Sequence, residues 1–162
     1  MDIRIVEREA FNIVGLKESV SLQNQDVNSE ITAVWATLTE EDIRELKQLS
    51  SEEPPGFISA TVNISSGREE GTNIDHFIGV ATNRPFSDKW QELHVPASSW
   101  MVFNSVGKFP DILKDMWEKI HSEWFGISGY LMGEGPEILW NESKDTSLPN
   151  FRSEIWIPVV KK

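Results

Sequence analysis

The sequence has 162 residues, of which 39% are hydrophobic and 25% charged, a composition typical of one globular domain and not of a disordered chain. Its formal net charge of −11 would repel nucleic-acid phosphates, so we expect no direct DNA or RNA binding. Cysteine is absent, which excludes disulfides and thiolate chemistry, and no apolar run suits a membrane span or a signal peptide, so we expect a cytoplasmic protein without membrane contact.

The first 38 residues predict a strand region followed by a helix. Alternating apolar residues indicate a strand or hairpin over residues 3–21, with a bend at Gly15. Asn28 or Ser29 is a suitable cap for a helix that carries an apolar stripe over residues 31–38, with Trp35 on that stripe.

The next segment predicts a short helix and a strand pair. Thr39 and Asp42 have the spacing of a capping box, which would start the helix, and Pro54-Pro55-Gly56 would stop it. Residues 57–64 and 74–82 are predicted strands that flank a polar turn at residues 65–72.

The second half predicts the same order of elements. Residues 90–106 supply one or two strands with a bend near Pro96-Ala97. Pro110 suits the first turn of a helix, and Gly126 is a suitable C-terminal stop for it. The apolar stripe of this helix consists of Ile112, Leu113, Met116, Trp117, Ile120 and Trp124.

The last two strands are predicted at residues 137–140 and 153–160, joined by a polar loop at 141–150. Each half is then strand, helix, strand, strand, which gives pseudo-repeats of approximately 1–84 and 90–162 within a single domain of residues 1–162. The predicted fold class is α+β: a duplicated β-α-β-β unit that forms one curved antiparallel sheet, with helices on one face and a ligand groove on the other.

Several segments of the second half resemble a known family. These are the run Val95-Pro96-Ala97-Ser98-Ser99-Trp100-Met101-Val102-Phe103, then Ser128-Gly129-Tyr130, Gly135-Pro136-Glu137 and the closing Ser153-Glu154-Ile155-Trp156-Ile157-Pro158-Val159. In this order they are similar to GyrI-like domains, the effector-binding domains fused to AraC-type and MerR-type regulators and also found as free-standing proteins. The likeness is strong from Val95 onward and weak before it.

The resemblance implies a groove that recognises hydrophobic, often cationic aromatic compounds, with a carboxylate on the last strand facing the ligand. Glu154 occupies that place here. The family often has a second glutamate in the preceding strand. Leu139 falls at the expected position unless the register uses Glu137 instead.

Strand alternation gives an independent argument for Glu154. Ile155, Ile157 and Val159 would form an apolar face under the helices, so Glu154 and Trp156 would share the opposite face. A carboxylate beside an indole suits a delocalised organic cation, since a cation–π contact adds about 0.5–2 kcal/mol to the Coulomb attraction. The alternative is a solvent-facing acid that forms a salt bridge with Arg152 or a lysine.

The chain contains seven tryptophans, more than a core of this size commonly uses. Those on helical stripes, Trp35, Trp117 and Trp124, are expected in the core. The further candidates for the ligand site are Trp100, Trp140, Trp90 and Phe57.

Other chemical signals are weak. His76, His94 and His121 lack metal-ligand spacing and are expected to be structural or surface residues. The sequence has no Gly-rich phosphate loop and no nucleophile elbow around its serines, so we expect no cofactor.

Three functions remain open from the sequence. The first is a free-standing, multidrug-like receptor or sequestering protein for amphipathic, cationic aromatic compounds, which would act by capture or would need an unknown protein partner for any regulatory role. The second is a hydrolase of strained electrophiles with Glu154 as general base. The third is a protein-interaction module, such as a gyrase inhibitor, whose acidic surface would mimic DNA.

Overall fold

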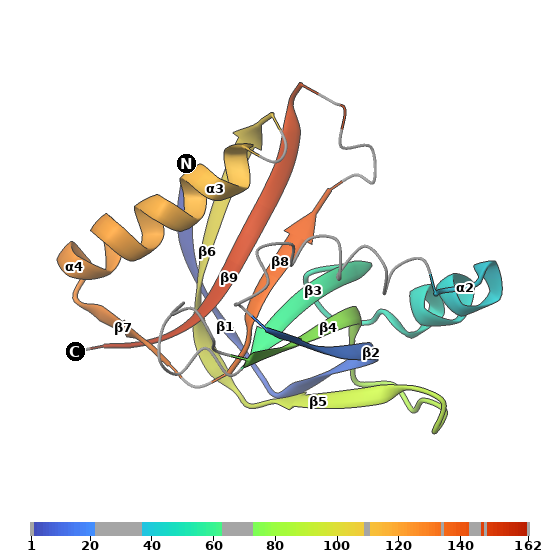
Figure 1. Cartoon of the computed structure of the whole chain (residues 1–162). Coiled ribbons are helices and arrows are strands. Elements are labelled where there is room, and N and C mark those ends of the chain that lie inside the picture. Colours follow the sequence, from blue (N-terminus) through green and yellow to red (C-terminus); the bar gives the residue numbers. More distant parts are fainter. Residues whose placement is uncertain are drawn as a thin grey trace. The chain divides into compact units, whose positions relative to one another are not determined.

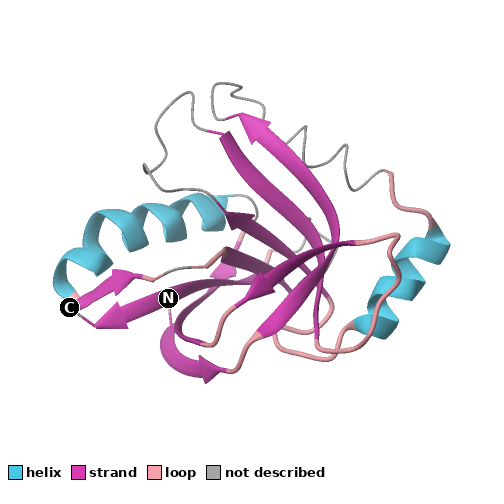
Figure 2. Cartoon of the chain, turned by 90° about the horizontal axis from the view of Figure 1, so that it is seen from below, coloured by secondary structure: helices cyan, strands magenta, loops and turns pink. Residues whose placement is uncertain are grey.

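The computed structural model describes residues 2–21, 37–62, 73–108, 111–133, 135–142, 147 and 149–161. The chain forms two compact units, which we call the α2 unit (Ala10–Pro96) and the α3 unit (Met1–Glu9 with Ala97–Lys162). Each unit combines antiparallel strands with a helix (Figures 1 and 2), so the predicted α+β class is confirmed.

The α2 unit is a four-stranded antiparallel sheet with one described helix. In spatial order its strands are β3 (Phe57–Val62), β4 (Asn73–Thr82), β2 (Phe11–Ser21) and β5 (Gln91–Val95). Helix α2 (Glu40–Leu49) begins at the predicted capping box: the Thr39 hydroxyl accepts from the Asp42 N–H, and the Asp42 carboxylate accepts from the Thr39 N–H. Leu46 of this helix packs in one core cluster with Val14 and Val80 of the sheet.

Gly15, where a bend was predicted, is instead a point of close approach between two strands. Strand β2 runs unbroken through Gly15, which lies opposite Gly79 of β4. A Cβ atom on Gly15 would lie 2.1 Å from the carbonyl oxygen of Ile78, and one on Gly79 would lie 2.0 Å from that of Val14. The two backbones can therefore come this close only because neither residue has a side chain.

Two expectations for the first half lie outside the described residues. They are the helix capped at Asn28 or Ser29, apart from its last residues Thr37 and Leu38, and the polar turn at residues 65–72. The predicted strand region at residues 3–21 forms two strands, β1 (Asp2–Arg8) and β2, which pair with different partners.

The sheet of the α3 unit is built around its last strand. In spatial order its strands are β1, β6 (Ser98–Gly107), β9 (Phe151–Lys161) and β8 (Glu137–Asn141), and β7 (Tyr130–Met132) pairs with the C-terminal end of β9. Strands β5 and β6 are separated at the predicted Pro96-Ala97 bend. Strand β7 has three residues, too few for a periodic pattern, and was not predicted.

Helix α3 (Asp111–Lys119) continues through a π-helical turn, η1 (Ile120–Trp124), into the short α4 (Phe125–Ile127), alongside β6 and β9 in Figure 1. The predicted apolar stripe is confirmed, because all six of its residues belong to the core between this helix and the sheet. Gly126 as the stop is wrong. It lies within α4, and Gly129, with φ of +79°, follows the end of the helix.

Candidate functional site

The two faces of the α3-unit sheet carry different residues. Met101, Phe103, Ile155, Ile157 and Val159 pack together with Met116 and Ile120 of the helical segment. Since side chains alternate along a strand, their neighbours occupy the helix-free face. By register that face carries Arg4, Val6, Trp100, Val102, Asn104, Ile138, Trp140, Arg152, Glu154, Trp156 and Pro158.

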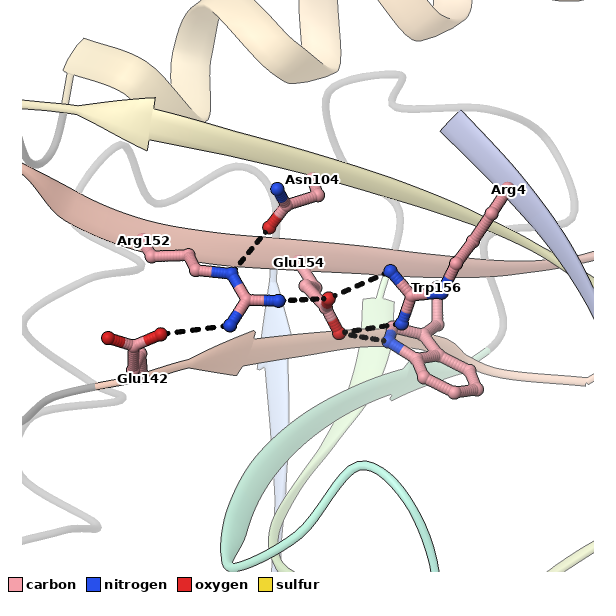
Figure 3. A network of polar contacts seen from close by, with 6 residues as sticks. All are labelled: Arg4, Asn104, Glu142, Arg152, Glu154 and Trp156. Atoms are coloured by element: carbon pink, nitrogen blue, oxygen red, sulfur yellow. Dashed lines mark hydrogen bonds and ion pairs between the residues drawn. The ribbon is translucent and has the colours of Figure 1, made fainter. Parts of the chain in front are cut away.

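The carboxylate of Glu154 is the centre of a polar network on this face (Figure 3). The residue is only 4% exposed. Its Oε2 accepts from Arg4 Nη1 at 3.0 Å and from Arg152 Nη2 at 3.1 Å, and its Oε1 accepts from Trp156 Nε1 at 3.1 Å. Two guanidinium groups and an indole N–H thus compensate the buried negative charge, which would otherwise be costly.

Arg152 is held by every nitrogen of its guanidinium. Nε donates to Asn104 Oδ1 at 2.9 Å, Nη1 to Glu142 Oε2 at 2.9 Å and Nη2 to Glu154. Its Cζ also lies 5.3 Å from the centre of the Trp140 ring. The hydrogen bond to Glu142, and then the charge of Glu154, raise the pKa of Arg152 above its ordinary value. Arg152 is therefore a fixed part of the face.

Arg4 approaches Glu154 from edge strand β1. Besides the 3.0 Å bond from Nη1, its Nη2 lies 3.5 Å from Glu154 Oε1, and its Cζ lies 5.9 Å from the centre of the Trp156 ring. The Arg4 side chain is 48% exposed. The sequence suggested a salt bridge to Arg152 or a lysine only for a solvent-facing Glu154; the structure has the Arg152 bridge with Glu154 buried. Arg4, which lies 150 residues away, was not considered.

The structure brings four of the candidate residues together. Trp100 and Trp156 are both buried, with ring centres 6.2 Å apart in an edge-to-face arrangement. Trp140 lies directly opposite Glu154 in the β8–β9 register. The helix-free face of the α3 unit thus combines one carboxylate with three indoles, a set of groups suited to delocalised cations.

Glu137 lies on the other face of this sheet. Its neighbour Ile138 pairs with Trp156, so Glu137 points to the helix side, where its Oε1 is 3.7 Å from Nε2 of His121 in η1. Leu139 pairs with Ile155 and also faces the helix. Neither position of β8 that was considered for a second acid therefore lies beside Glu154.

Trp90 and Phe57 belong to the α2 unit. Trp90 is buried in the cluster that includes Leu46 and Val80, and its Nε1 donates to Glu45 Oε1 at 3.2 Å. Phe57 is half-buried and packs against the same cluster. In the α2 unit, both aromatic residues thus serve as packing between its helix and its sheet.

Comparison with known families gives a match over residues 1–160 to the GyrI-like small molecule binding domain. No curated protein is significantly similar to this sequence. The described helices are all too short or too polar to cross a lipid bilayer.

Solved structures share the fold at low sequence identity. SAV2435, solved bound to tetraphenylphosphonium, is 20% identical, with 99% of this chain and 94% of that chain covered and a TM-score of 0.77. A protein from Staphylococcus aureus MU50 is 19% identical, with 98% of both chains covered and a TM-score of 0.74. The C-terminal domain of EcmrR is 11% identical, with 99% of this chain and 98% of that chain covered and a TM-score of 0.65.

Proposed function

Because the chain belongs to the GyrI-like family of small-molecule-binding domains, we propose that it binds amphipathic aromatic cations against Glu154, on the helix-free face of the α3 unit. The predicted ligand groove would lie over this face. Trp140 and Trp156 would supply aromatic contacts, with the buried Trp100 packed against Trp156, and Glu154 would supply the charge.

The observation that carries this proposal is the pair of guanidinium groups on Glu154. A guanidinium is a planar, delocalised cation, and each one here combines a hydrogen bond to the carboxylate with an indole ring within 6 Å: Arg4 with Trp156 at 5.9 Å, and Arg152 with Trp140 at 5.3 Å. The chain's own side chains thus illustrate the chemistry that an organic cation would use.

Two further facts support a cationic ligand. The net charge of −11 attracts cations to the protein as a whole. A structure of the same fold, that of SAV2435, contains tetraphenylphosphonium, a cation with four aromatic rings. The alternative of a hydrolase loses support, because Glu137 lies on the other face and supplies no second acid beside Glu154.

Tetraphenylphosphonium is a suitable probe, and Glu154→Gln is the decisive variant. In the wild type, Arg4 and Arg152 balance Glu142 and Glu154, so neutralising Glu154 leaves the network with a net positive charge. We expect the dissociation constant, measured by tryptophan quenching or calorimetry, to rise at least about tenfold, the equivalent of 1.4 kcal/mol.

The matched control is Glu118→Gln on the exposed side of α3, which changes the net charge of the protein by the same amount. It should bind the probe as the wild type does. Equal affinities of the Glu154→Gln and Glu118→Gln variants would refute the role of Glu154, and a wild type that does not bind any aromatic cation would refute the proposed function.

A further inference from the structure

We infer that Arg4 is a built-in competitor of the ligand: its guanidinium occupies the cation position at Glu154, and a bound aromatic cation displaces it. The inference rests on the proposed function and specifies which group must move and which ligands suit the vacated position.

The two arginines at Glu154 differ in how firmly they are held. Arg152 has three side-chain partners and the Trp140 ring. Within the part of the chain that the structure describes, the Arg4 guanidinium has polar or ring contacts only with Glu154 and Trp156. The Arg4 side chain is also half exposed. Water can therefore replace much of the interaction that its guanidinium loses when it leaves Glu154, as for other exposed ion pairs.

The charges of the network favour an exchange of one cation for another. Glu142 and Glu154 carry two negative charges and Arg152 one positive charge, so without Arg4 the network has a net charge of −1. Arg4 brings this to zero. A ligand with a single positive charge restores the same balance, whereas a neutral ligand leaves the network with its net charge of −1.

The hydrogen bonds of Glu154 define the ligand further. After Arg4 leaves, Oε1 still accepts from Trp156 Nε1 and Oε2 still accepts from Arg152 Nη2. Each carboxylate oxygen therefore keeps a donor, and the ligand does not have to supply one. The ligand class that fits is the aromatic onium ion, a permanent cation without N–H or O–H groups that contributes charge and ring contacts alone.

The test compares two probes of nearly the same shape and opposite charge, tetraphenylphosphonium and tetraphenylborate, on the Arg4→Gln variant. We expect the affinity for tetraphenylphosphonium to increase at least about fivefold, within the range of typical coupling effects. The affinity for tetraphenylborate should fall or stay unchanged. Arg44→Gln, on the exposed side of α2, is the control for net charge, and Arg4→Lys, which keeps the cation, should bind as the wild type does.

The outcomes separate this inference from the proposed function. If the wild type binds tetraphenylphosphonium and Arg4→Gln binds it no better than Arg44→Gln does, the competitor role is refuted while the function stands. If Arg4→Gln strengthens both probes equally, Arg4 acts by blocking space and the charge exchange is refuted. If neither the wild type nor Arg4→Gln binds the cation, the proposed function fails, and the inference fails with it.

Discussion

Glu154 and His76 are both buried ionisable residues, but they differ in the polar groups that surround them. Glu154 has two guanidinium groups and an indole N–H around its carboxylate. His76 of β4 has the Thr61 hydroxyl 3.2 Å from its Nδ1, and burial lowers the pKa of its imidazole to about 4. The first site is built to hold a charge, whereas the second disfavours one.

The burial of His76 predicts a loss of stability in acid. The pKa of His76 in the unfolded chain is near its ordinary 6.5, so below that pH the unfolded state binds a proton that the folded state binds only near pH 4. His76 therefore lowers the free energy of unfolding as the pH falls from 6.5 towards 4, by up to about 3 kcal/mol.

Urea unfolding of His76→Gln at pH 7.5 and pH 5 measures this effect. The variant should lose less stability between the two pH values than the wild type, and His94→Gln, at an exposed position of β5, should behave as the wild type does. An unchanged pH dependence in His76→Gln would show that other groups cause the acid sensitivity.

The candidate site was predictable from the sequence where its residues are close in the chain. Alternation along one strand placed Glu154 and Trp156 on the face opposite Ile155, and the nearby Arg152 was a foreseeable partner. Arg4 was not foreseeable, because its contact depends on the registers of β1 with β6 and of β6 with β9. A one-residue shift in either register would turn Arg4 to the other face.

At the scale of elements, the pairing of β2 with β4 depends on the two facing glycines. We expect Gly79→Ala to lower the free energy of unfolding by about 3 kcal/mol, because the added methyl group would lie 2.0 Å from the carbonyl oxygen of Val14 and a backbone would have to move. Gly126→Ala in α4 is the control, since no atom lies within 4 Å of its added Cβ. Denaturant unfolding that finds the two variants equally stable would contradict this account.

Elements with a clear period were predicted well, and irregular ones were not. The apolar stripe of α3 and the capping box at Thr39 are local patterns, and both are present. The π-helical turn η1 could not be predicted from the apolar stripe. A π-helical turn contains one more residue than an α-helical turn, but Ile120 and Trp124 face the core all the same. The helix also continues past Gly126, where a stop was predicted, because glycine permits a helix end without requiring one.

At the scale of the whole molecule, the net charge of −11 predicts that the association rate of a cationic ligand depends on the salt concentration. Electrostatic attraction raises the association rate of a cation, and added salt screens it, with a Debye length of about 30 Å at 0.01 M and about 10 Å at 0.1 M. Raising NaCl from 10 to 300 mM should slow the association of tetraphenylphosphonium by about threefold to tenfold, measured by stopped-flow tryptophan quenching. Tetraphenylborate should associate faster in salt, and a slowing of both probes would rule out long-range attraction as the cause.

The division into units was harder to predict than the strands themselves. The predicted pseudo-repeats follow the order of elements along the chain, whereas the two compact units follow strand pairing, and β1 pairs with β6 in the α3 unit. Hydrophobic alternation identifies a strand without indicating its partner, and Ile3 and Ile5 would alternate in the same way beside β2. The partner of an edge strand follows from the whole topology, which local patterns do not contain.

The pairing of β1 with β6 joins two strands that are synthesised far apart in time. Asn104, the partner of Asp2, is translated 102 residues after it, a delay of roughly 5 to 20 seconds at ordinary translation rates. All of the α2 unit is made in that interval, and Glu154 follows Asn104 by 50 further residues. The nascent chain thus carries Arg4 without its carboxylate partner until Glu154 has been made, so β1 completes its contacts only after the α2 unit has been translated.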